Sequence, residues 1–123
     1  MKKKILVVDD SLNLRLTLKK FLEGQYNLEF AENGQECMDL LEKTKDIDML
    51  ILDVNMPVKD GIQVVHEIGT RDDINDLHTI MLTTETSDEK KNEIRKYNFV
   101  RCWVIKPITE DLIVATIEKI FLK

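Results

Sequence analysis

Residues 5–10 read ILVVDD, four consecutive apolar residues followed directly by two carboxylates. An apolar run of this length, bounded by polar residues, is typical of a strand that is buried on both faces. Stretches of similar length that are wholly or mostly apolar recur along the chain. They cover residues 5–8, 28–31, 49–52, 79–82 and 103–105. We therefore expect five strands.

The segments between these runs have apolar residues at helical spacing, such as Leu14, Leu18 and Leu22, or Ile62, Val65 and Ile68. Strands that alternate with helices predict an α/β fold with a parallel sheet. A chain of 123 residues has the length of one domain. We expect five helices and one domain spanning residues 1–123.

Two local signals compete with this interpretation. Leucines alternate with polar residues over residues 12–18, as in a half-buried strand, and Asn33-Gly34 is a strong hairpin dipeptide. A helix is favoured at the first site because Ser11 is a suitable N-cap and Gly24 a suitable stop. A helix is also favoured after Gly34, because the residues that follow have helical spacing.

Composition excludes several classes of protein. The chain is 43% apolar and 33% charged, which is ordinary for a globular domain and unlike a disordered one. The net charge is −5, so a nucleic-acid backbone would on average be repelled. The longest apolar runs are four residues, against the roughly 20 that cross a bilayer, so no membrane insertion is expected.

Two cysteines, Cys37 and Cys102, are far apart in sequence, and the apolar run after the basic N-terminus is too short for a signal peptide. This combination favours a reduced, cytoplasmic setting over a disulfide framework.

Polar side chains follow four of the five predicted strands where each strand ends. They are Asp9, Asp10, Asp53, Thr83 and Lys106. The carboxyl ends of parallel strands share one edge of the sheet, and ligands bind in the crevice where the strand order reverses. These residues, distant in sequence, are therefore expected to meet in one pocket. Taken singly, each could be a helix cap or a solvated charge, but five together are poorly explained as caps.

Three carboxylates within about 4 Å of one another would repel by roughly 4 kcal/mol per pair at an effective dielectric near 20. A divalent cation is the natural remedy, and an all-oxygen ligand set suits Mg²⁺ or Mn²⁺ better than zinc. A cation, a lysine and a hydroxyl beside an aspartate are the parts of a phosphoryl-transfer site. The aspartate can itself be the covalent acceptor.

Five stretches, in this order and spacing, resemble the receiver domains of response regulators in two-component signalling, and the chemotaxis type in particular. They are ILVVDDSLNLR, AENGQE, ILDVNMPVKDGIQ, MLTTE and WVIKP. The resemblance spans essentially the whole chain. It implies a doubly wound, flavodoxin-like sheet with the strand order 2-1-3-4-5.

The resemblance also implies roles for the strand-end residues. Asp53 would accept a phosphoryl group from a histidine kinase or a phosphotransfer protein. Mg²⁺ would be held by Asp10, Asp53 and the backbone carbonyl of Asn55, with Asp9 acting mostly through water. Such a domain catalyses its own phosphorylation and dephosphorylation, with no dedicated turnover of a small molecule.

Further roles follow from the same resemblance. Thr83 and Lys106 would contact the phosphoryl group, and Trp103 holds the aromatic switch position. Pro107 is expected to follow a cis peptide bond, as the family commonly has, and Pro57 and Gly61 would shape the loop after Asp53. A downstream protein would dock on the fourth helix, fifth strand and fifth helix.

Asn55 and Glu85 match the pair that flanks the path of the hydrolytic water in chemotaxis receivers, which implies a short-lived acyl phosphate. Two departures stand out: Thr84 replaces the usual small residue beside Thr83, and Phe99-Val100 replaces the usual Gly-Ala. We assign no role to the two histidines.

Three alternatives remain open from the residues. A phosphatase of the haloacid-dehalogenase type also forms an aspartyl phosphate, but it needs an acid two residues later, where this chain has Asn55. A degenerate receiver acting as a scaffold would have lost Asp53, Thr83 or Lys106, and all three are present. A receiver domain cut from a larger transcriptional regulator is the third.

Overall fold

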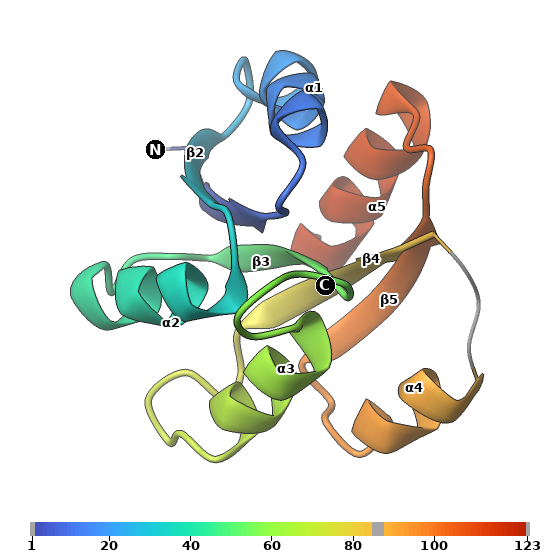
Figure 1. The fold of residues 1–123 in the computed structure, drawn as a ribbon. Helices are drawn as coiled ribbons and strands as arrows, with labels where there is room; N and C mark the ends of the chain where they lie inside the picture. Colours follow the sequence, from blue (N-terminus) through green and yellow to red (C-terminus); the bar gives the residue numbers. More distant parts are fainter. Residues whose placement is uncertain (1, 85–87, 123) are drawn as a thin grey trace.

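Five parallel strands form one sheet in the order β2-β1-β3-β4-β5, as expected (Figure 1). The structure is a computed structural model that describes residues 2–84 and 88–122. The strands are β1 (Lys4–Val8), β2 (Asn27–Ala31), β3 (Met49–Asp53), β4 (His78–Thr83) and β5 (Val100–Ile105). The order reverses between β1 and β3, so the carboxyl ends of these neighbours flank the crevice of the doubly wound fold.

The predicted five helices alternate with the strands and cover both faces of the sheet (Figure 1). They are α1 (Leu12–Leu22), α2 (Gly34–Lys43), α3 (Gly61–Gly69), α4 (Asp88–Ile94) and α5 (Glu110–Phe121). Buried side chains of α1 and α5 pack on one face, and those of α2, α3 and α4 pack on the other. α1, α2, α3 and α5 each bury several apolar residues against the sheet, whereas Ile94 is the buried residue of α4. Cover on both faces explains why β1 and β3 are almost wholly apolar.

Local capping decides both ambiguous segments in favour of helices. The Ser11 hydroxyl accepts a hydrogen bond from the Leu14 amide at 3.3 Å, so the alternating leucines begin α1. The Asn33 side chain accepts from the Glu36 amide at 2.9 Å, and the Asn-Gly dipeptide therefore starts α2. In both places a short polar side chain satisfies an amide that the first helical turn leaves without a partner.

The outer strands differ from the prediction. We expected every strand to be buried on both faces, but β2 and β5 are only partly buried because each lies at an edge of the sheet. The fifth strand also begins at Val100, three residues before the predicted start. Its early residues include the exposed Arg101, and an edge strand tolerates such a residue where an internal strand does not.

None of the helices in ranges 2–84 and 88–122 combines the length and apolar character that crossing a bilayer demands. Cys37 and Cys102 are both free, in line with the expected absence of a disulfide framework. The peptide bond between Lys106 and Pro107 is cis, as the resemblance implied.

The loop from β3 to α3 is held tightly against the sheet edge. The Gly61 amide donates to the Val54 carbonyl at 2.8 Å, and a Cβ at Gly61 would lie 2.3 Å from the Asp53 carbonyl oxygen. Within the same loop Val58 has φ of 69°, a left-handed conformation that is costly for a β-branched residue. The loop after Asp53 therefore requires a residue without a side chain at position 61.

Substitution Gly61→Ala is expected to lower the free energy of unfolding by about 1–3 kcal/mol, because the new methyl group would push against backbone atoms. Gly24→Ala is the matched control, since a Cβ there meets nothing within 4 Å. Urea unfolding followed by circular dichroism measures both. Equal free energies of unfolding for the Gly61→Ala variant and the parent would contradict this prediction. They would show that the loop can move away from the end of β3 at no cost in stability.

Candidate functional site

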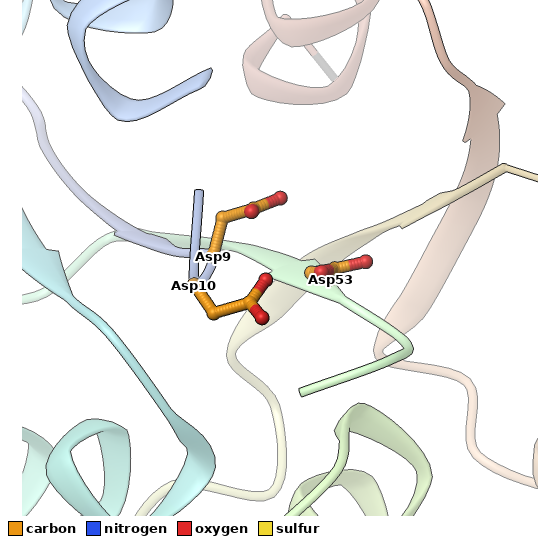
Figure 2. A group of neighbouring side chains, drawn as sticks. All are labelled: Asp9, Asp10 and Asp53. Carbon is orange, nitrogen blue, oxygen red and sulfur yellow. The ribbon is translucent and has the colours of Figure 1, made fainter. Parts of the chain in front are cut away.

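Neighbouring strand ends bring three carboxylates together. Val8 of β1 is paired with Leu52 of β3, so Asp9 and Asp53, the next residue in each chain segment, lie side by side. Asp9, Asp10 and Asp53 each offer one carboxylate oxygen, and these three atoms all lie within 4.8 Å of one another. Figure 2 shows the three side chains extending from the ends of β1 and β3.

Lys106 lies between two of these carboxylates. Its Nζ is 2.9 Å from Asp9 Oδ2 and 3.4 Å from Asp53 Oδ1. Asp9 has no exposed surface and Asp53 is only 4% exposed, so both acids are buried beside the ammonium. The direct contact of Asp9 with Lys106 was not part of the sequence-based expectation. The position of Lys106 is fixed in turn by its amide, which donates to the Thr83 carbonyl at 2.8 Å.

Backbone amides from two loops complete the surroundings of the buried acids. The Ser11 amide donates to Asp9 Oδ1 at 2.8 Å, and the Asn55 amide donates to Asp53 Oδ1 at 3.4 Å. The oxygens of a buried carboxylate need such donors, because an unsatisfied buried charge is strongly unfavourable. The acids are thus held by backbone amides as well as by the Lys106 side chain.

The pKa of Asp53 is raised to about 6. Burial is the largest cause and the neighbouring charge of Asp9 adds to it, while Lys106 and the Asn55 amide act in the opposite direction. For Lys106, burial acts to lower the pKa. The hydrogen bond to Asp9 and the charges of Asp53 and Asp9 outweigh it, and the pKa is raised above its usual value. The ammonium therefore stays charged at neutral pH, whereas Asp53 is ionised at a free-energy penalty that another cation would relieve.

The donor set fits a small divalent cation. Three carboxylates face one ammonium, which leaves two negative charges when all groups are ionised. Oxygens that share one Mg²⁺ at about 2.1 Å are at most about 4.2 Å apart. Carboxylate oxygens already within 4.8 Å of one another reach that separation by small side-chain rotations. The chemistry and the spacing both suit Mg²⁺ or Mn²⁺.

Other predicted site residues lie on β4 and β5. Thr83, the last residue of β4, is buried one residue beyond the partner of Asp53 in the strand pairing. Trp103 lies on β5, half-buried on the face covered by α2, α3 and α4, and no contact joins it to the acids in the described parts of the chain. Glu85 lies outside the described residues.

Two residues near the site had no signal in the sequence. The Arg15 guanidinium of α1 donates to the backbone carbonyl of Asp9. The Lys90 ammonium of α4 donates to Asn55 Oδ1 at 3.2 Å. Neither belongs to a strand end, so the pattern that located the other residues could not have located these.

A family model described as the response regulator receiver domain matches residues 5–118. The chain is 34% identical to a chemotaxis protein CheY homolog of Campylobacter jejuni over 119 residues, which cover 95% of this chain and 91% of that protein. It is 31% identical to the chemotaxis protein CheY-3 of Vibrio cholerae over 120 residues, covering 96% of this chain and 91% of that protein.

Solved structures match over the same extent. The Vibrio cholerae chemotaxis protein CheY4 has a TM-score of 0.88 at 32% identity, covering 97% of this chain and 98% of that chain. A response regulator receiver protein of Pseudomonas putida also has a TM-score of 0.88, at 22% identity and the same coverage, which shows likeness of fold.

Removal of the Asp53 charge should stabilise the protein at neutral pH. The folded state raises this pKa from 3.8 to about 6, so folding favours the protonated acid, and stability falls as pH rises through that window. In a chelating buffer, the free energy of unfolding of Asp53→Asn should exceed that of the parent by about 2–3 kcal/mol above pH 7. The difference should vanish near pH 4. Urea unfolding across this pH range measures the difference. A parent that is more stable than the variant at pH 8 would contradict it.

Proposed function

The chain belongs to the response regulator receiver family of two-component signalling, and on that basis we propose that Asp53 accepts a phosphoryl group from a histidine kinase or phosphotransfer protein. The observation that carries the proposal is the buried arrangement of Asp9, Asp53 and Lys106, with Asp10 completing an oxygen site for a cation. Phosphorylation of Asp53 changes the affinity of the domain for a downstream protein. A cytoplasmic setting belongs to the same proposal.

In the transfer step, an Asp53 carboxylate oxygen forms a bond to phosphorus as the bond from phosphorus to the donor nitrogen breaks. The bonding electrons leave with the imidazole of the donor histidine. Lys106, already 3.4 Å from Asp53 Oδ1, neutralises charge on the phosphoryl oxygens, and the Thr83 hydroxyl donates to another of them. The chain contributes positioning and charge, which is what phosphoryl transfer chiefly requires.

Asp10, Asp53 and the backbone carbonyl of Asn55 are the proposed ligands of Mg²⁺, with Asp9 behind them. When bound, the cation neutralises the two excess negative charges and polarises the phosphoryl oxygens. In autodephosphorylation, a water oxygen attacks phosphorus, and the bond from phosphorus to the Asp53 oxygen breaks. The bonding electrons return to the Asp53 carboxylate. Asn55 is exposed at the rim of the site, where its side chain can flank the path of that water.

The response to phosphorylation is proposed to pass from Thr83 to Trp103 and to the surface of α4, β5 and α5. A groove of about 950 Å³ runs between β5 and α5 and is lined by the exposed Ile105 and Leu112. His78, Arg101 and Lys119 also line it, and none of the acidic residues within 2–84 and 88–122 does. The groove thus offers apolar and basic groups to a protein partner in a chain whose net charge is negative.

The geometry argues against a dedicated phosphatase. Asn55 stands where an enzyme of that kind needs a carboxyl group, and its Oδ1 accepts a hydrogen bond from Lys90. An amide cannot donate and recover a proton as a carboxyl group can. Turnover of foreign phosphomonoesters is therefore expected to be slow.

Incubation with a small phosphodonor and Mg²⁺ should add the mass of one phosphoryl group, as measured by intact-protein mass spectrometry. Asp53→Ala should gain nothing, because the acceptor oxygen is gone. Asp39→Asn is the matched control, since it removes an exposed carboxylate of α2, and it should be modified like the parent. A parent that stays unmodified, or an Asp53→Ala variant that is modified, would overturn the proposed function.

The acyl phosphate should be short-lived, and Asn55→Lys should slow its decay by about tenfold, because an ammonium can contact the phosphoryl oxygens and obstruct water. Decay is followed by mass spectrometry after removal of the donor. Glu85→Lys should alter the lifetime as well. Decay over many hours in the parent would remove the basis for assigning Asn55 and Glu85 to this role.

A further inference from the structure

Two adjacent lysines of α4 contact two separate parts of the proposed switch. The Lys90 ammonium donates to Asn55 Oδ1 at 3.2 Å, and Asn55 belongs to the loop whose amide contacts the phosphoacceptor. The Lys91 ammonium lies 5.6 Å from the centroid of the Trp103 ring, within reach of a cation–π interaction. The middle of this seven-residue helix thus touches both the site and the aromatic residue proposed to report its state.

We propose that Lys90 and Lys91 form a coupling path from Asn55 to Trp103 that is separate from the one through Thr83. In this path Lys90 is a positioning residue for Asn55, and Lys91 is a positioning residue for the Trp103 ring. The proposal rests on the proposed function, since it concerns how occupancy of Asp53 reaches Trp103.

The packing of α4 explains how the two contacts can be linked. Consecutive helical residues point in different directions, so one turn can reach two neighbours at once. Ile94 is the buried residue of α4, and Glu93 contacts His66 of α3 at 3.2 Å, so the end of the helix is held while its middle depends on the lysine contacts. A change in the Lys90 contact therefore moves Lys91 relative to the ring.

Free space beside the Trp103 ring allows the ring to change its position when α4 moves. A cavity of about 220 Å³ is lined by Trp103 together with Lys91, Ile94 and Arg95 of the α4 segment. Trp103 is half-buried, so its side chain is not locked by packing on every side. A ring that borders free volume and lies near a cation can change its position without repacking the core.

Trp103 is the single tryptophan of the chain, so its fluorescence reports on this ring alone. Acrylamide quenching and emission are measured for the unmodified protein, with Mg²⁺ alone, and with Mg²⁺ plus the small phosphodonor. In unmodified protein, Lys91→Met should raise the quenching constant by about 1.5-fold, because the ring loses its cation contact. Lys90→Met should reduce the emission change per phosphorylated molecule by about half, with the modified fraction of each sample measured by mass spectrometry.

Lys96→Met is the matched control. It removes the same charge from a lysine that lies 5.3 Å from the Tyr97 ring centroid, and it should behave like the parent. Lys90→Arg can still donate to Asn55 and should restore the emission change, which a general loss of helix stability would not allow. It also serves as the second variant if Lys90→Met folds poorly.

The outcomes separate the two proposals. A parent that gains no phosphoryl mass overturns the proposed function and the coupling together. If the parent is modified but Lys90→Met shows the full emission change, the coupling alone is wrong. Lys91→Met with parental quenching would likewise overturn the assignment of Lys91 to the Trp103 ring.

Discussion

The buried contact of Lys106 with Asp9 and Asp53 is the interaction on which the rest of the site depends. Two carboxylates at the ends of adjacent strands would repel strongly inside the protein if no cation separated them. The ammonium reduces this repulsion but leaves an excess of two negative charges once Asp10 is included. A site of this kind suits a divalent cation, and the proposed function adds an anionic phosphoryl group to it. The raised pKa of Asp53 reflects its burial first and the remaining repulsion from Asp9 second.

The fold supports this charge arrangement with its most rigid parts. β1 and β3 are almost wholly buried between two layers of helices, so the strand ends that carry Asp9 and Asp53 have little freedom to separate. The loop after Asp53 is fixed by the close approach of Gly61 to the strand and contains Val58 in a left-handed conformation. Backbone strain in the loop and the burial of like charges both lower the stability of the fold. The same features belong to a pocket whose geometry is fixed in advance.

The proposed coupling away from the site uses the less rigid parts of the fold. α4 is short, buries few side chains, and contacts the site through Lys90 and the last strand through Lys91. Elements with few buried contacts shift at small free-energy differences, which suits them to a switch. Trp103 also lines the groove between β5 and α5. A movement of its ring would therefore change the surface that is available to a partner.

The sequence by itself determined the alternation of strands and helices, the helix starts at Ser11 and Asn33, and the set of polar residues at strand ends. These features depend on apolar runs, capping chemistry and spacing, which are local. It did not reveal that β5 begins at Val100, that Asp9 contacts Lys106 directly, or that Arg15 and Lys90 reach the site. These features became visible only in the folded protein. Each depends on which segments, distant in sequence, are neighbours in space, and the packing of the whole sheet and its helices determines those neighbours.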